Sequence, residues 1–396
     1  TVILTDYTEE QMFVRLTGLS TENGNPAVIA PYDKGGDTYT ALVAPQSVAA
    51  GTAFITCAFN NGKTFAYRMQ GAAEWKAGEE YTYTVSLAAA KDPGYTIEGD
   101  GSYTVTTADG LKNVAKLVNE EGKTDINITL DTDLTLTGEW TPIGSYINYT
   151  YTGYTGTFDG QGHTIFGLTI NQVRDAVGLI GCIDKGGIVK NVKLKDVNIT
   201  GDGYFVGGVA GTNYGTIENC SVDGTLTNNR HYLGGVVGNN YGSIIGCSSS
   251  GTITGTSPNV GGIGGQSVGG TIMACYSVAN IKGRSSSGGV LGQTNRETVV
   301  IACYHAKGNV TGEQSRMIGG VIGWNYGKVT ACYWENNQGQ GIGDNQGSTT
   351  IETTKVDGTD VTWQKAVAAM NTALQSAGSE WRYELTGALP TLKKEQ

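Results

Sequence analysis

The residues of this chain that could support acid–base or metal chemistry are few and scattered. The histidines, His163, His231 and His305, lie far apart, and neither a CxxC nor an HExxH motif occurs. Because a zinc site needs several such ligands at short, regular spacing, we expect no metal site. His305 follows Cys303 by two residues, the place that Val222 holds in an earlier repeat. This position predicts a core histidine whose ring is hydrogen-bonded inside the fold.

A catalytic pair of carboxylates is also not expected. Glycoside hydrolases use two positioned carboxylates, and other polysaccharide-degrading sites use clusters of charged side chains. Residues 203–296 carry few charged side chains, and Glu218 and Asp223 only flank one strand. We interpret both as solvated surface residues and predict no catalytic residue and no enzymatic activity. A polysaccharide-degrading β-helix enzyme is the alternative.

One column of tyrosines could bind a ligand. The residue after each repeated cysteine is, in order, Ser221, Ser248, Tyr276, Tyr304 and Tyr333. If each cysteine points inward, its neighbour along a strand points outward. Tyr276, Tyr304 and Tyr333 would then form an exterior ladder, which could stack on sugar rings or contact a partner. The alternative is that the rings stack on one another and stabilise the sheet.

The cysteines themselves indicate a structural column. Of the seven cysteines, the last five recur every 27 to 29 residues, and Val192 holds the matching place one repeat earlier. A position that accepts valine or cysteine is typical of a small buried side chain. We therefore expect free core thiols, with bridges between neighbouring thiols as the alternative. The predicted core column is Val192, Cys220, Cys247, Cys275, Cys303 and Cys332.

A repeated phrase defines the elements that would position these residues. Related phrases begin at Val177, Val206, Leu233, Val260, Ser287 and Ile318, and read VGLIG, VGGVAG, LGGVVG, VGGIGG, SGGVLG and IGGVIG. Their final glycines are 27 to 31 residues apart, a period that predicts stacked repeats, each too small to bury its own apolar face. Each repeat is consistent with three short strands. The sequence therefore predicts a parallel β-helix, or solenoid, of about six coils.

Other segments flank the repeats. Residues 1–92 show alternating apolar strands with no helix between them, which predicts an antiparallel β-sandwich. A helix starting near Thr107 and a second over 363–377 are expected to cap the open ends of the solenoid. We therefore expect an all-β chain of three parts: a sandwich over 1–92, the solenoid over 95–345, and a C-terminal cap with one helix over 346–396.

Composition excludes several kinds of partner. The chain has 396 residues, only 16% of them charged, and a net charge of −10 without a basic run. Nucleic acid is therefore not an expected partner. No apolar run approaches the roughly 18 residues that a membrane helix needs, so no transmembrane segment is expected. The glycine pairs match neither a phosphate-binding loop nor a dinucleotide fingerprint, and we expect no cofactor.

The repeats resemble a known motif. VGGVAG, LGGVVG and IGGVIG, each followed about ten residues later by ENC, IGC or TAC, are similar to the GLUG repeat of bacterial surface proteins. The run TGEWTPIGS…TGTFDGQGHTIFGLTI resembles the segment that precedes such repeats. This resemblance covers roughly residues 95–345.

Residues 37–87 resemble a second family, the fimbrillin-type pilus subunits of Bacteroidales. The motifs are LVAPQSV (42–48), FITCAFNNGKTFAYR and WKAGEEYTYTVSL (75–87). The family implies a β-sandwich subunit or adhesin on the cell surface, assembled by strand donation. This chain departs from it, because only about ninety residues are available and a solenoid follows.

Together the two resemblances imply a non-catalytic adhesin or a tip or accessory pilus subunit, exported to the cell surface, the outer membrane or fimbriae. Its expected partners are pilus or other surface-assembly subunits and a host or dietary glycan or protein ligand. A structural spacer without a ligand is a further alternative. Glycan binding that requires the tyrosine ladder would separate the adhesin from the spacer.

Overall fold

The computed structural model describes residues 1–5, 12–20, 26–59, 64–87, 93–147, 150–256, 258–313, 315–335, 339–347 and 351–395. It divides the chain into two units, Thr1–Asp92 and Pro93–Gln396. Each unit has its own apolar core, because the buried residues before Asp92 form one cluster and those after Pro93 form two others. The C-terminal residues 346–396 belong to the second unit and are not a unit of their own.

The first unit is a β-sandwich whose alternating apolar residues meet between two sheets. Val14, Ile55 and Val85 come from both sheets and are buried in one core. One sheet has the order β10-β1-β5-β4, the other β3-β2-β7-β8, and β6 pairs with β9. Since β1 and β10 are parallel, the sandwich is not purely antiparallel as expected. The strands are β1 (Val2–Thr5), β2 (Met12–Ser20), β3 (Pro26–Ile29), β4 (Tyr32–Gly35), β5 (Thr38–Thr40), β6 (Gln46–Val48), β7 (Ala53–Phe59), β8 (Thr64–Arg68), β9 (Ala73–Trp75) and β10 (Tyr83–Ser86).

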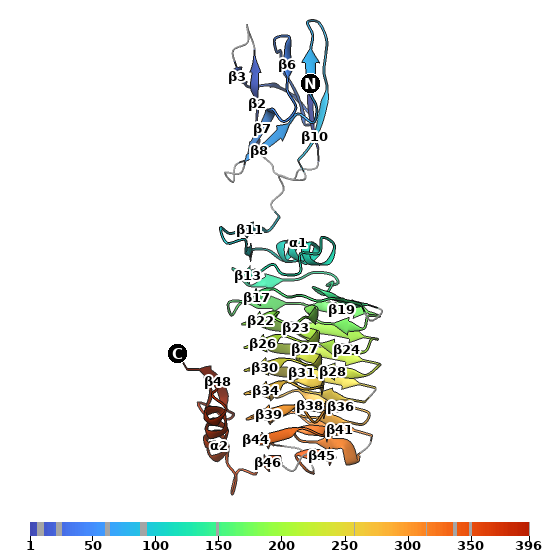
Figure 1. The fold of residues 1–396 in the computed structure, drawn as a ribbon, viewed down its shortest axis with the longest axis vertical. Coiled ribbons are helices and arrows are strands. Elements are labelled where there is room, and N and C mark those ends of the chain that lie inside the picture. The colour runs from blue at the N-terminus through green and yellow to red at the C-terminus, as the bar shows by residue number, and fades with distance from the viewer. Residues whose placement is uncertain are drawn as a thin grey trace. The chain divides into compact units, whose positions relative to one another are not determined.

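After Pro93 the repeats stack into a parallel β-solenoid of about 8 turns (Figure 1). Equivalent strands of successive turns pair in register, as Ile217 with Ile244 and Ile244 with Ile272. This register puts aliphatic side chains above one another inside the coil, where they are fully buried. The described part of the solenoid contains more turns than the six predicted from the glycine phrase, because turns without that phrase extend the stack at both ends.

The largest sheet of the solenoid has 21 strands among the described residues. Its long strands are β23 (Lys193–Gly201), β27 (Ser221–Asn228), β31 (Ser248–Gly255) and β44 (Lys328–Trp334). The shorter ones are β11 (Tyr95–Ile97), β12 (Tyr103–Val105), β13 (Ile128–Leu130), β14 (Leu134–Thr135), β17 (Thr157–Asp159), β18 (Thr164–Phe166), β19 (Thr169–Gln172), β22 (Ile188–Lys190), β26 (Thr216–Glu218), β30 (Ser243–Ile245), β34 (Thr271–Met273), β35 (Tyr276–Ser277), β36 (Asn280–Gly283), β39 (Val299–Ile301), β40 (Tyr304–His305), β41 (Val310–Gly312) and β46 (Ile351–Lys355).

The glycine phrases form two smaller sheets that approach each other closely. A β-carbon on Gly211 would lie 2.5 Å from the backbone nitrogen of Val177, so no side chain fits there. One sheet contains β20 (Ala176–Val177), β24 (Phe205–Gly207), β28 (Tyr232–Gly234), β32 (Val260–Gly261), β37 (Ser287–Gly288) and β42 (Ile318–Gly319). The other contains β21 (Ile180–Ile183), β25 (Ala210–Asn213), β29 (Val237–Asn240), β33 (Gly264–Ser267), β38 (Leu291–Thr294), β43 (Ile322–Asn325) and β45 (Ile342–Asn345).

A buried polar column runs along one corner of the solenoid. The Asn213 side-chain amide donates to Asn240 Oδ1 at 2.8 Å, and Asn240 donates to Ser267 Oγ at 3.2 Å. Further along, Asn325 donates to Asn345 Oδ1 at 3.0 Å. Each turn therefore satisfies a buried polar group of its neighbour, which favours this register over any shifted one.

The first end of the solenoid is covered by α1 (Ala108–Asn119). Thr107 caps this helix, because its hydroxyl accepts a hydrogen bond from the backbone nitrogen of Gly110 at 3.0 Å. The buried face carries the predicted residues Leu111, Val114 and Val118, which pack into the solenoid core. A hairpin of β15 (Ser145–Ile147) and β16 (Thr150–Thr152) contacts β20 and β21 of the first turns.

The C-terminal segment lies along the side of the solenoid. It consists of α2 (Trp363–Ser376) and a hairpin of β47 (Trp381–Glu384) and β48 (Thr391–Lys394). A short 3-10 helix, η2 (Ser315–Met317), lies within the solenoid before its last turns and is not part of this segment. Both α2 and the hairpin pack against the outer face of the 21-stranded sheet (Figure 1). The prediction that the second helix closes the far end was wrong, because its apolar residues Met370 and Leu374 are buried against a lateral face.

Candidate functional site

The cysteine column lies inside the solenoid. Its predicted members are at most 1% exposed, and every cysteine of the chain is free and buried. Adjacent members are in direct contact, since the backbone nitrogen of Cys220 lies 3.5 Å from Cys247 Sγ. Burial raises the pKa of Cys247 and Cys303 and keeps these thiols protonated. The column therefore contributes packing, and its enclosed thiols are not accessible to reagents in solvent.

The predicted tyrosine ladder points outward from the coil but is not an open surface. Tyr276 and Tyr304 stack with their ring planes 4° apart and their centroids 5.0 Å apart. Tyr304 is fully buried beneath the C-terminal segment and donates a hydrogen bond to the carbonyl of Pro390 at 2.6 Å. Tyr333 is 8% exposed. The prediction of an exterior ladder of three rings was therefore wrong for Tyr304 and Tyr333, which are buried. Tyr276 is partly exposed to solvent.

The chemistry of this outer face changes where the C-terminal segment covers it. In one strand column the residues Lys190 and Glu218 are followed, in register, by Ile245, Met273 and Ile301. In the next column Asn191 and Asn219 give way to Gly246, Ala274, Ala302 and Ala331. The change from polar to apolar or small side chains falls at the turn where the C-terminal segment begins to cover the sheet. The side chains of each turn therefore agree with whether that turn is covered.

The second of these columns has a left-handed backbone in every turn. Asn219 has φ 52°, and Ala302 has φ 51°. Asparagine tolerates this conformation, whereas alanine adopts it at a cost of about 1–2 kcal/mol. Small residues stand in the covered turns because a larger side chain would collide with the C-terminal segment. At Gly246, even a β-carbon would lie 2.7 Å from Trp381 Cζ2.

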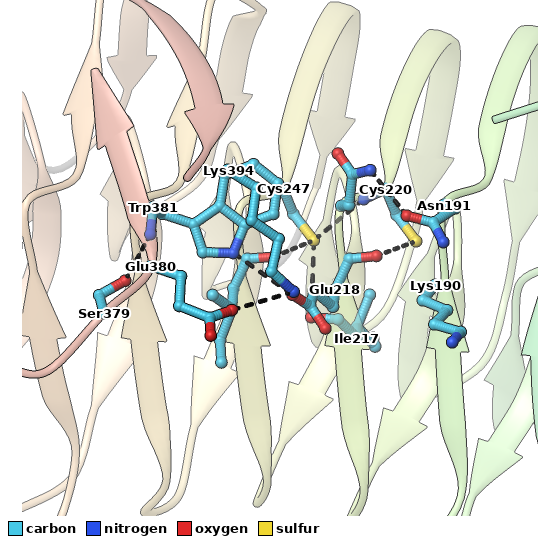
Figure 2. Close-up of polar contacts among 12 residues, drawn as sticks. Lys190, Asn191, Ile217, Glu218, Cys220, Cys247, Ser379, Glu380, Trp381 and Lys394 are labelled. Carbon is cyan, nitrogen blue, oxygen red and sulfur yellow. Dashed lines mark hydrogen bonds and ion pairs between the residues drawn. The ribbon is translucent and has the colours of Figure 1, made fainter. Parts of the chain in front are cut away.

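A polar cluster fixes the edge of the covering segment (Figure 2). Lys394 Nζ lies 2.7 Å from Glu218 Oε1 and 3.5 Å from Glu380 Oε2. The indole nitrogen of Trp381 donates to Glu218 Oε1 at 3.4 Å. The hydrogen bond to Glu218 raises the pKa of Lys394. Glu218 thus holds the hairpin in place.

The remaining predicted candidates are structural. His305 is buried, and its Nε2 lies 3.1 Å from the carbonyl oxygen of Ala279. Asp223 Oδ1 accepts a hydrogen bond from Ser250 at 2.6 Å, while Glu218 pairs with Lys394, so the two carboxylates serve different contacts. Among the described residues, no three His, Cys, Asp or Glu side chains are grouped as a metal site requires. Neither of the described helices is long and apolar enough to cross a membrane.

A partly exposed aromatic cluster on the solenoid was missed by the sequence analysis. We call it the aromatic platform: Tyr204, Phe205, His231 and Tyr232, at one edge of two successive turns. Tyr204 stacks on His231 at 5.2 Å with 8° between the rings, and Phe205 stacks on Tyr232 at 5.5 Å with 18°. Tyr204 is 37% exposed and His231 is also exposed.

Polar groups flank the aromatic platform. The guanidinium carbon of Arg230 lies 5.8 Å from the Tyr204 ring centroid, and Arg230 Nε lies 3.7 Å from Asp202 Oδ1. The side chain of Asn228 accepts a hydrogen bond from the backbone nitrogen of Arg230 at 3.2 Å, which positions this loop. Flat apolar faces beside hydrogen-bonding groups are the surface that sugar rings and aromatic partners fit.

The solenoid does not need these rings for stacking. At the positions of Phe205 and Tyr232, the preceding turn has Ala176 and the following turn has Asn259. A signal was nevertheless present in the sequence: the pairs Tyr-Phe and His-Tyr stand 27 residues apart, directly before two glycine phrases. A smaller pair of rings, the half-buried Tyr214 and the exposed Tyr241, stacks at 4.4 Å on another corner.

The first unit contains a hollow of about 520 Å³. Its walls include the apolar side chains of Val14, Leu16, Phe54 and Trp75. Tyr83 also borders it and accepts a hydrogen bond from the indole nitrogen of Trp75 at 2.8 Å. The hollow therefore lies between the two sheets of the sandwich, and its lining combines these apolar side chains with charged ones such as Lys34 and Glu80.

Comparison with known proteins identifies two parts of the chain. A model of the fimbrillin-like family matches residues 12–109, and the GLUG motif matches residues 202–227 and 229–254. Both are families of structural or surface proteins and not of enzymes. The aromatic platform lies within the two GLUG matches, which contain Tyr204 and Tyr232.

Two curated relatives match short stretches. Halomucin of Haloquadratum walsbyi is 46% identical over 74 residues, which are 18% of this chain and 1% of that protein. A putative Gly-rich membrane protein of Evansella cellulosilytica is 34% identical over 131 residues, which are 31% of this chain and 15% of that protein. The chain thus spans only a small part of each relative.

Among solved structures, an IgA1 protease superposes with a TM-score of 0.48 and 17% identity, over 88% of this chain and 29% of that one. This likeness is too loose to indicate a shared activity. The motif matches and the fold agree with each other: the chain combines an N-terminal fimbrillin-like region with a β-solenoid that carries GLUG motifs.

Proposed function

We propose that this protein is a non-catalytic adhesin or accessory pilus subunit, located at the cell surface, whose solenoid presents a binding surface for a glycan. The observation that carries the proposal is the aromatic platform, because it exposes stacked rings that the repeat itself does not require. The families matched by the chain support a surface or pilus-related role.

The chemistry of the aromatic platform favours a glycan over an apolar partner. The rings offer flat faces for the C–H surfaces of sugars, while Arg230 and Asp202 at the rim can hydrogen-bond hydroxyl or carboxylate groups. The two exposed side chains Tyr204 and His231 are held parallel before any ligand arrives. A preorganised surface loses little side-chain entropy on binding.

Binding to a glycan array tests this proposal. The double substitution Tyr204→Ser and His231→Ser should strongly weaken binding of the glycans that contact the aromatic platform, because it removes the exposed stack from the edge of the solenoid. The matched control, Tyr214→Ser with Tyr241→Ser, removes a comparable stack elsewhere and should leave binding unchanged. Undiminished binding by the first variant would remove the aromatic platform from the proposal. Release of reducing sugar ends by the wild-type protein would instead favour the enzyme.

The partner on the bacterial side is proposed to be a pilus or other surface-assembly subunit. The hollow of the first unit, which has apolar side chains in its walls, is the feature that would receive an extended segment of such a subunit. Affinity purification of the full chain from intact cells should recover pilus subunits. Substituting Leu16→Arg in the wall of the hollow should reduce that recovery, while glycan binding stays unchanged. Recovery that is equal in both proteins would contradict this partner.

A further inference from the structure

A second hollow lies on the solenoid where the polar part of the outer face meets the C-terminal hairpin. It measures about 190 Å³, and Asn191, Asn219, Ser221 and Ser248 line its floor. Thr391 of β48 forms part of its wall, and Tyr276 borders it as well. The aromatic platform contributes no residue to this hollow, so the two are separate places on the molecule.

The floor presents uncharged hydrogen-bonding groups in regular rows. Ser221, Ser248 and Tyr276 pair in register on successive strands, about 4.8 Å apart. The side chain of Asn219 donates to Asn191 Oδ1 at 2.7 Å, which fixes both amides. The hydroxyls of Ser221 and Ser248 make no hydrogen bond with any described residue. They are therefore available to a ligand that can both donate and accept.

The hollow exists because the aromatic stack stops at Ser248. One face of the Tyr276 ring is covered by Tyr304, 5.0 Å away and almost parallel. On the other side, the next strand carries a serine in the same register position, so no ring stacks there. The open face of Tyr276 therefore borders the hollow. Tyr304 is anchored to the carbonyl of Pro390, which holds the pair rigid.

We propose that a neutral hexopyranose unit of a glycan binds in this hollow, stacked on the open face of Tyr276 in the place where another aromatic ring would continue the column. Ser221, Ser248 and Asn219 hydrogen-bond its hydroxyl groups. A neutral sugar fits better than an acidic one, because the side chains next to the open face of Tyr276 are uncharged. The charged residue of the lining, Lys193, lies three strands away from Tyr276, and the nearby Lys394 is already paired with Glu218. This site does not depend on the aromatic platform.

Filling the hollow provides the test. Ser248→Tyr would continue the stack of Tyr276 and Tyr304 and occupy the sugar position, while the in-register geometry lets the turn fold. Thr252→Tyr adds the same ring at an exposed position of β31 outside the hollow and serves as the control. Both are made in the full chain that already carries Tyr204→Ser and His231→Ser, so that binding at the aromatic platform does not contribute.

Calorimetric titration is done with hexasaccharides of glucose, mannose and galacturonic acid. We expect at least one neutral hexasaccharide to bind, and Ser248→Tyr to weaken it by about tenfold or more, the loss of one well-packed contact site. Thr252→Tyr should bind as the parent does. Absence of binding by every neutral hexasaccharide, preference for galacturonate, or equal binding by Ser248→Tyr would each overturn the proposal. None of these results bears on the aromatic platform, which the array experiment tests separately.

Discussion

His305 is an imidazole buried in a column that holds valine or serine in other turns. Val222 and Ser277 occupy the equivalent positions, and a β-carbon on the neighbouring Gly289 would collide with the His305 ring. Burial lowers the pKa of His305 to about 4, although the contact with the Ala279 carbonyl opposes this shift. The histidine is therefore neutral in the folded protein at neutral pH.

This burial predicts an acid-sensitive stability. In the unfolded chain the pKa returns to about 6.5, so between pH 6.5 and 4 the unfolded state binds a proton that the folded state does not. The contribution of His305 to the free energy of unfolding is fully present above pH 6.5. It falls by roughly 3 kcal/mol as the pH drops to 4. His305→Gln should remove this part of the pH dependence in thermal unfolding measured from pH 4 to 7. An identical pH profile in the variant would contradict the assignment.

The thiols give a second prediction at this scale. Burial raises the pKa of Cys57 to about 11 and that of Cys182 to about 12, and the repeated cysteines are equally enclosed. Since the thiolate is the reactive form, the folded protein should react negligibly with Ellman's reagent. Unfolding in urea without reductant should release seven thiols per chain, the number of cysteines present. A lower count would reveal bridges between neighbouring turns.

Single residues show what the sequence could and could not predict. The spacing of the cysteines was sufficient to place Cys247 or Cys303 inside a coil, because residues one repeat apart occupy the same position in successive turns. The same reasoning correctly pointed Tyr304 outward but could not show that it is covered, since the carbonyl it bonds lies 86 residues further along the chain. Burial by distant segments is not encoded in local periodicity.

At the scale of elements, the C-terminal segment and the face beneath it are matched. The covered turns carry Ile245, Met273 and Ile301, whereas Glu218 at the edge of the segment and Lys190 one turn earlier are charged. The amphipathic pattern of α2 indicated a helix that needs an apolar partner, but the pattern does not say which surface. The apolar substitutions in successive repeats were the missing signal, because a repeat that faces water on one side has no reason to lose its charges there.

A substitution at Gly246 tests whether the small side chains of the covered turns are needed for the C-terminal segment to pack there. An asparagine is compatible with its φ of 65°, as Asn219 shows in the preceding turn, but its side chain would collide with the Trp381 indole. Gly246→Asn should therefore loosen the hairpin and speed hydrogen exchange in β47, β48 and α2. Exchange in the strands of the solenoid core should remain slow. The opposite substitution in the preceding turn, Asn219→Gly, should leave exchange of the hairpin unchanged.

At the scale of the whole molecule, the two units have separate cores. The buried residues of Thr1–Asp92 form a cluster of their own, and α1 covers the first turn of the solenoid from within the second unit. The sequence indicated this boundary through its change from sandwich-like strands to repeats. It did not indicate the number of turns, because the turns at either end of the stack lack the glycine phrase.

This separation predicts that the second unit folds without the first. A chain beginning at Pro93 should keep the far-ultraviolet circular dichroism of its strands and the unfolding midpoint of the solenoid in the full chain. The full chain should show an additional transition that belongs to the sandwich. A large decrease in the midpoint of the shortened chain would show that the first unit stabilises the solenoid.

The covering segment also limits how the repeat array can change in length. Insertion or loss of one whole turn among the uncovered, polar repeats shifts the first end of the stack and leaves the footprint of α2 and its hairpin intact. Insertion within the covered repeats would instead separate Ile245 and Gly246 from Ala302, so the segment would no longer meet its matching side chains. We therefore expect duplication of repeats to be tolerated before the turn of Glu218 and to disrupt the contacts of the C-terminal segment after it.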